Sequence, residues 1–169
     1  MRKALDRLYD GAAYLAAVFL IATLVFIALS IAGRLLNFHV RGTDAYAGYA
    51  MAACGFLALA HTLKRGEHIR VTLLLHHLGA RAHRALELWC YALATLASAA
   101  FAYFSVRLAW QSYAFNDIST ANDATPLWIP QIAMAVGTVV LLVAFVDELV
   151  VEIRGGRHAR AGDEPAHVE

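Results

Sequence analysis

Charge is scarce in this sequence of 169 residues. Asp, Glu, Lys and Arg together make up 16% of the chain, whereas a soluble domain contains about 25% of these residues. Hydrophobic residues account for 60% of the chain, and the mean hydropathy is +0.56. This composition is typical of an integral membrane protein. The net charge of +1 gives no indication of a nucleic-acid partner, and we expect none.

Cysteine is also rare, and its two positions argue against a cross-linked protein. Cys54 and Cys90 both lie inside apolar runs. Thiols in apolar helices are more often small core residues than partners in a disulfide. We therefore expect two free cysteines in the core.

Motifs for catalysis, cofactors and metals are missing as well. The chain has no Gly-rich phosphate loop and no His-Glu-x-x-His pattern. A haem between helices needs axial ligands at matching depths, yet His61 lies at the end of an apolar run and no histidine lies at the centre of one. Structural zinc sites use paired ligand spacings, which the remaining central histidines lack. We therefore expect no enzyme, no metal and no cofactor. These histidines are His68, His76, His77 and His83.

Long apolar runs are what the sequence does contain. Residues 12–32 carry no charge and would form a helix of about 31 Å, enough to cross a bilayer core. The run is too long for a cleaved signal peptide, so we expect a retained signal anchor. The fold class is predicted to be an all-α membrane domain over residues 1–153, followed by a flexible tail over 154–169. The predicted spans are 12–32, 45–63, 86–113 and 127–148.

A basic and then apolar segment separates the second and third spans. Residues 67–79 are too few to cross a bilayer, which needs about 20 residues. A short amphipathic segment of this kind is satisfied by lying in the headgroup plane. We predict an interfacial helix over 67–79, anchored to phospholipids by charged residues at its start. The candidate anchors are Lys64, Arg65, Glu67, His68 and Arg70.

Basic residues are distributed unequally across the four predicted spans. Of the 14 Lys and Arg residues, all except Arg34, Arg41 and Arg107 lie on one side. Positive residues favour the cytoplasmic side of a membrane. We therefore predict that both termini and the interfacial helix face the cytoplasm, and that the acidic loop over 116–126 faces outward.

Small residues in the second span suggest contact with another helix. Gly and Ala let helices approach closely in lipid, where apolar contact alone gives little incentive to associate. A carrier that works alone places ionisable groups at mid-depth, and these spans lack them there. The chain therefore reads as a membrane scaffold. Candidate packing residues are Gly48, Ala52, Gly55, Arg34 and Arg107.

Three segments together resemble a known family. These are residues 33–38, which leave the first span, 63–71, which leave the second, and 125–131, which open the last. The chain resembles, over roughly residues 5–152, the DctQ-type small membrane subunit of a tripartite ATP-independent periplasmic (TRAP) transporter. Two positions depart from the family pattern. Thr72 replaces a residue that is often acidic, and Asp44 alone remains of an acidic pair.

The resemblance implies a non-catalytic scaffold in the bacterial inner membrane. Its partners would be a large DctM-type membrane subunit, which carries an organic acid and Na⁺, and a periplasmic DctP-type binding protein. Na⁺ would bind the large subunit and not this chain. The outer segment would lie near the docked binding protein. Candidate docking residues are Asp117, Asp123, Pro126 and Trp128.

Two other functions compete with the scaffold. A small membrane redox or haem-binding subunit would show a Soret absorption band, and the depths of the histidines argue against it. A stand-alone small exporter would have to assemble with copies of itself to build a pathway, and it would be active without a partner chain.

Overall fold

The computed structural model describes residues 2–38, 40–64 and 80–154, and within these ranges the fold is helical. Each of its four helices is long and apolar enough to cross a membrane, which confirms the predicted all-α membrane fold. The predicted interfacial helix over 67–79 and the tail from residue 155 onward lie outside the described residues. The helices are α1 (Arg2–Leu35), α2 (Thr43–Lys64), α4 (Ala80–Ala114) and α5 (Trp128–Ile153).

The helices extend beyond the apolar runs that predicted them. α1 has 34 residues and α4 has 35, and a helix of 35 residues is about 52 Å long. A bilayer core is only about 30 Å thick. Backbone hydrogen bonding continues past the last apolar residue, because charged side chains on a helix can reach water or headgroups. Hydropathy therefore locates the membrane-crossing part of a helix and not its ends.

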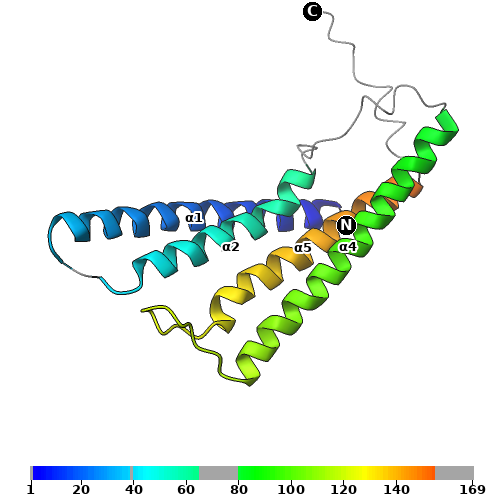
Figure 1. Cartoon of the computed structure of the whole chain (residues 1–169). Coiled ribbons are helices and arrows are strands. Elements are labelled where there is room, and N and C mark those ends of the chain that lie inside the picture. Colours follow the sequence, from blue (N-terminus) through cyan, green and yellow to red (C-terminus); the bar gives the residue numbers. More distant parts are fainter. Residues whose placement is uncertain (1, 39, 65–79, 155–169) are drawn as a thin grey trace, which may run out of the picture.

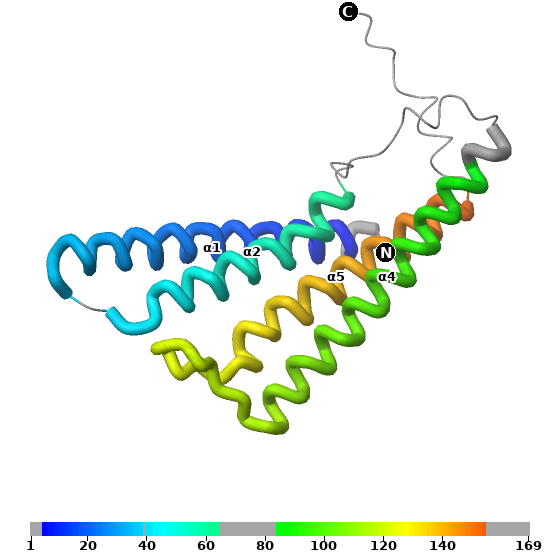
Figure 2. The backbone as a smooth tube through the Cα atoms, in the orientation of Figure 1, coloured from blue at the N-terminus to red at the C-terminus, as the bar shows by residue number. Residues whose placement is uncertain are grey.

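The four helices form two antiparallel helix pairs that pack on each other through α2 and α5. We call the α2–α5 contact the seam. α1 packs on α2, α4 packs on α5, and α2 packs on α5, so α2 and α5 are the inner helices (Figure 1). The helices converge towards the start of α1 and the end of α5 and diverge towards the two short connections (Figure 2). We call the diverging end, with connections 36–42 and 115–127, the loop end. The opposite end is called the charged end.

The core begins at the charged end, where α1, α2 and α5 meet. Tyr9 from α1 is 1% exposed and lies in one cluster with Ala60 and Leu63 of α2 and Leu141 and Ala144 of α5. A large ring against alanines is complementary packing, because the small residues leave the space that the ring fills. Tyr9 thereby fixes α1 to both inner helices.

The seam between α2 and α5 depends on one glycine. A Cβ atom on Gly137 would lie 2.6 Å from the backbone carbonyl of Phe56. No side chain fits in that space, so glycine permits a backbone approach that any other residue would block. Opposite it, α2 presents a face of buried small residues and leucine. This buried face of α2 consists of Ala47, Ala50, Ala53, Leu57 and Ala60.

Buried hydroxyl groups inside the bundle bond to their own helices. Thr23 donates to the carbonyl of Phe19 at 2.8 Å, and the Thr138 hydroxyl lies 3.0 Å from the carbonyl of Met134. Ser98 makes the same kind of bond within α4. Such bonds satisfy a hydroxyl without a partner on another helix. Contacts between helices at these positions are therefore apolar.

Both cysteines are free, but only one is shielded. Cys54 on α2 is partly buried, whereas Cys90 on α4 is exposed. The expectation of a core position was therefore wrong for Cys90. Hydropathy cannot separate a residue that faces other helices from one that faces lipid, because both surroundings are apolar.

Candidate functional site

The connection between α4 and α5 at the loop end is an ordered turn, and we call its residues 117–127 the hairpin. The backbone N–H of Asp117 donates to the carbonyl of Ser112 at 3.0 Å, and the carbonyl of Asp117 accepts from Leu127 at 2.9 Å. A single bridge pairs Ile118 with Pro126. These bonds satisfy backbone groups that would otherwise need water, and they hold residues 117–127 in one shape.

Side chains tie this hairpin to the start of α2. The Tyr49 hydroxyl donates to the Ser119 hydroxyl at 2.9 Å, and Ser119 donates to the Asp123 carboxylate at 2.8 Å. Thr125 donates to the Tyr46 hydroxyl at 3.3 Å. α2 therefore uses two tyrosines, one helical turn apart, to position the hairpin.

Asp123 is held as a carboxylate in this network. Partial burial raises the pKa of Asp123, but the neighbouring Thr125 and Ser119 hydroxyls, its own backbone N–H and the Tyr49 hydroxyl lower it by more. The pKa of Asp123 therefore lies below its ordinary value of 3.8. Hydrogen bonds that favour the charged form act in this direction. At neutral pH the hairpin contains a fixed negative charge.

The other connection packs against the same hairpin. Gly42 has φ of 78°, a left-handed conformation that favours glycine. A Cβ atom there would lie 2.7 Å from the Cβ of Asp123. The two connections of the loop end therefore form one continuous surface.

An ion pair and a cavity lie on the α1–α2 side of this surface. Arg34 lies 3.4 Å from the Asp44 carboxylate, and Ser30 donates to the other carboxylate oxygen at 2.8 Å. The single acidic residue that remains of the expected pair thus makes a salt bridge within this chain. The side chains of Arg34 and Asp44 are 77% and 75% exposed. A cavity of about 560 Å³ opens here, with Ser30, Arg34, Asn37, Thr43, Asp44 and Asn122 among its lining residues.

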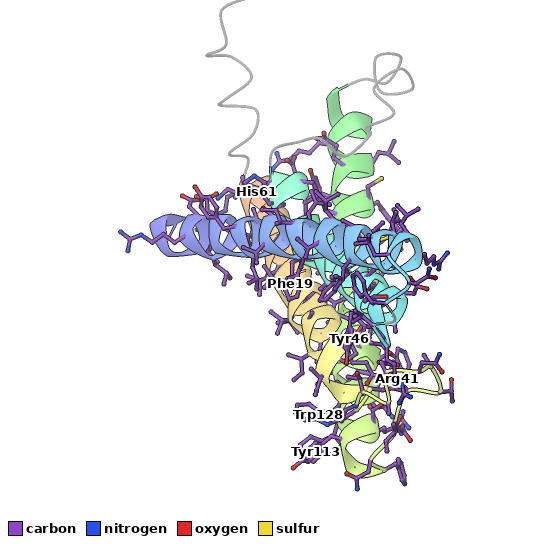
Figure 3. All side chains as sticks on the ribbon, turned by 90° about the vertical axis from the view of Figure 1, so that its left-hand side faces the viewer. Phe19, Arg41, Tyr46, His61, Tyr113 and Trp128 are labelled. Carbon is purple, nitrogen blue, oxygen red and sulfur yellow. The ribbon has the colours of Figure 1, made fainter. Side chains whose placement is uncertain are left out.

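The predicted docking residues all lie in or beside the hairpin. Asp117 and Pro126 are exposed, whereas Asp123 is partly buried and faces α2. The Trp128 ring meets the Tyr113 ring edge-on, with centroids 5.7 Å apart, at the loop end (Figure 3). Aromatic rings with polar tips suit the boundary between apolar membrane and water.

The predicted packing residues separate into different places. Gly48, Ala52 and Gly55 are exposed on α2, and a Cβ atom on either glycine would meet nothing within 4 Å. We call this stripe the open face of α2. Arg34 lies instead at the loop end, and Arg107 is exposed on α4. The structure brings the three small residues together and places the two arginines elsewhere.

Lys64 is the one predicted membrane anchor among the described residues. Its ammonium group pairs with the Asp6 carboxylate and lies 4.8 Å from the centroid of the Tyr9 ring. His61 lies one turn earlier, with Nδ1 3.6 Å from Asp10 (Figure 3). Lys64 and His61 of α2 thus face two α1 carboxylates at the charged end. The other predicted anchors, Arg65, Glu67, His68 and Arg70, lie outside the described residues.

Two buried polar groups at the charged end lack hydrogen bonds. These are the hydroxyl of Tyr9 and the carboxylate of Glu152, each in a residue 1% exposed. Across the described ranges, no three His, Cys, Asp or Glu side chains lie close enough together to hold a metal ion. The charged end thus offers ion pairs for packing α1 on α2.

Sequence reasoning missed the tyrosine network at the loop end. Tyr49 and Ser119 are separated by 70 positions in the chain. A signal was present in Tyr46 and Tyr49, because two tyrosines spaced by three lie on one helical face. Their partners depend on how two loops pack, which no local pattern specifies.

Comparison with protein families matches residues 23–155 to the family described as "Tripartite ATP-independent periplasmic transporters, DctQ component". The match includes the last three of the described helices, both connections of the loop end and α1 from residue 23 onward. No curated protein matches the chain.

Proposed function

Because this chain belongs to the DctQ component family of the tripartite ATP-independent periplasmic transporters, we propose that it is a non-catalytic scaffold for a larger permease subunit. The permease, of DctM type, would carry the organic acid and the coupled Na⁺. A DctP-type binding protein would deliver the acid. This chain would bind neither the acid nor Na⁺.

The open face of α2 is the observation that carries this proposal. Gly48, Ala52 and Gly55 leave a shallow strip on an inner helix. In lipid, such a strip gains little from contact with acyl chains, but it lets a neighbouring helix approach closely. A permease helix lying along this strip would bind the scaffold through close van der Waals contact.

The interior of the bundle supports a static role. The hydroxyls of Thr23, Ser98 and Thr138 bond to carbonyls one turn away in the same helix, and the residues packed around Tyr9 are apolar. A transport route needs polar groups directed into a shared cavity at membrane depth. Substrate and Na⁺ would therefore move through the permease alone.

We place the loop end in the periplasm and both termini in the cytoplasm of the bacterial inner membrane. The positive-inside rule supports this orientation. The binding protein would contact Asp117, Pro126 and Trp128, while Asp123 would act as a brace beneath them. An ordered hairpin loses little conformational entropy on binding, which supports its use as a docking surface.

The segment that follows α2 would bind the cytoplasmic surface of the membrane. Arg65 and Arg70 would contact anionic phospholipids, with Glu67 and His68 in the same layer and an interfacial helix over 67–79. Lys64 supports this placement because it ends α2 at the charged end. Replacing Arg65 and Arg70 with Glu is expected to reduce uptake, and normal uptake at normal expression would contradict this role.

Co-purification from native membranes tests the scaffold directly. The tagged chain should bring down a many-helix permease in equal amounts. Gly55→Leu should lower permease recovery about tenfold, because a bulky side chain separates the helices. Gly11→Leu is the matched control, since a Cβ on Gly11 also meets nothing within 4 Å. A wild-type chain that purifies alone, or full recovery with Gly55→Leu, would overturn the proposal.

A further inference from the structure

The cavity at the loop end places two opposite charges side by side. Its volume is about 560 Å³, within the range of sites that hold small ligands or headgroups. The Arg34 guanidinium and the Asp44 carboxylate both line it, and both are about three-quarters exposed. The cavity can therefore bind a ligand that carries both a cation and an anion.

The Arg34 and Asp44 side chains lie close together, but their contact leaves both with hydrogen-bonding capacity for a ligand. One contact of 3.4 Å joins them, which is long for a charge-assisted hydrogen bond. Ser30 holds the other oxygen of Asp44 at 2.8 Å. An exposed pair of this kind contributes little to stability, so a ligand can separate the two groups without unfolding their surroundings.

The depth of the cavity matches the headgroup layer of a membrane. The membrane-crossing stretch of α1 ends at Leu35, one residue beyond Arg34. Leu35 and Leu36 are 77% and 71% exposed. Phe38 and Val40 line the cavity and are also exposed. Apolar side chains therefore border a polar cavity at the point where acyl chains give way to headgroups.

We propose that this cavity binds the headgroup of phosphatidylethanolamine. Arg34 donates to the phosphate, for which its planar guanidinium is suited. Asp44 accepts from the primary ammonium group, and Ser30 holds Asp44 in position. The exposed leucines of the α1–α2 connection contact the acyl chains. The lipid fills the space between the two connections of the loop end.

The charges of the cavity distinguish among lipids. An anionic headgroup such as phosphatidylglycerol has a phosphate for Arg34 and hydroxyls that can donate to Asp44, but it has no cation for the negative charge of Asp44. Phosphatidylcholine has a cation without N–H donors, so it cannot hydrogen-bond to the carboxylate. Phosphatidylethanolamine satisfies both residues. The same chemistry exists in a soluble zwitterion, which lacks only the acyl chains.

Native mass spectrometry of the purified full chain tests the assignment. Delipidated protein in detergent is mixed with equal amounts of phosphatidylethanolamine, phosphatidylglycerol and phosphatidylcholine of identical acyl chains. The wild type should retain phosphatidylethanolamine about tenfold over the others, the ratio expected from one charge-assisted hydrogen bond. Arg34→Gln and Asp44→Asn should each remove that preference. Arg41→Gln, an exposed arginine of the same connection outside the cavity, should leave it unchanged.

A competition with soluble glycerophosphoethanolamine separates a lipid from a free zwitterion. The lipid assignment holds if the soluble compound displaces lipid only at a large excess. It is overturned if the soluble compound competes at equal concentration. Equal retention of the three lipids by the wild type would overturn the proposal, whether or not the variants fold. A preference for phosphatidylethanolamine that persists in both Arg34→Gln and Asp44→Asn would overturn it as well.

Discussion

The two faces of α2 are built from the same kinds of residues and serve different surroundings. One face, with Ala47, Ala50 and Ala53, is covered by this chain. The other, with Gly48 and Gly55, is open. Composition cannot distinguish them, because small residues suit a helix partner whichever chain supplies it. What differs is that α1 and α5 of this chain pack on α2, whereas nothing in the described part of the chain lies within 4 Å of a Cβ atom on Gly48 or Gly55.

Under the proposed scaffold role, the difference explains how a subunit is stable alone and still leaves a surface for a partner. The covered face fixes the chain's own shape through α1 and α5, and the open face would remain for another protein. Substitutions on the covered face should therefore change the stability of the isolated chain, and those on the open face should change only its assembly.

The largest effect is expected at the seam between α2 and α5. Gly137→Ala places a methyl group 2.6 Å from the backbone of Phe56, so the helices must move apart. We expect a loss of about 1–3 kcal/mol in the free energy of unfolding, as for other overpacked cores. Thermal unfolding of the purified chain in detergent measures it.

Gly48→Ala is the matched control on the open face. Its new methyl group meets nothing within 4 Å, and alanine favours the helix by about 1 kcal/mol over glycine. Unfolding of Gly48→Ala should occur at or above the wild-type temperature. Equal destabilisation by Gly137→Ala and Gly48→Ala would show that the two faces are not distinct.

A smaller effect is expected where the covered part of α2 reaches the hairpin. Tyr49→Phe removes the hydrogen bond to Ser119, and a bond of this kind contributes about 1 kcal/mol. Hydrogen exchange should accelerate in residues 117–127 and stay unchanged in the helices. Met51→Ala, at a residue 69% exposed, should leave the hairpin unchanged. Wild-type protection of residues 117–127 in Tyr49→Phe would show that Tyr49 does not hold the hairpin in position.

Lys64 tests the other end of α2. Lys64→Gln removes the ion pair with Asp6 and the contact with the Tyr9 ring. Because both charged side chains are partly exposed, solvent screens the pair, and the expected loss is below about 1 kcal/mol. The unfolding temperature should fall slightly at low salt and less at high salt. A loss that persists in high salt would show that packing, not charge, carries the contact.

The smallest effect is a dependence on acid. Since the folded pKa of Asp123 is lowered from 3.8, its contribution is fully present above about pH 4 and is lost as pH falls through the folded pKa. Wild type should therefore lose stability below about pH 4 more steeply than Asp123→Asn. Unfolding temperatures measured across that range in both proteins would show it, and parallel curves would contradict it.

Much of the fold followed from hydropathy, whereas the site followed only in part. The four helices were predictable because long apolar runs have few alternatives in a membrane. The small residues of α2 were predicted to pack, but periodicity could not say that Ala50 would be buried and Gly48 exposed. Asp123 was predicted as a docking residue. Its engagement by Ser119 depends on long-range loop packing that no local pattern encodes.

The order of the helices in the chain determines when the seam between α2 and α5 can form. α5 is synthesised after α1, α2 and α4, yet it packs on α2, which is made much earlier. Until α5 is made, α1 already packs on α2, but the backbone of α2 at Phe56, where Gly137 will lie, is still uncovered. Once α5 is in place the seam is closed, so a helix of another protein that arrives later can no longer enter it and meets the open face of α2 at Gly48, Ala52 and Gly55.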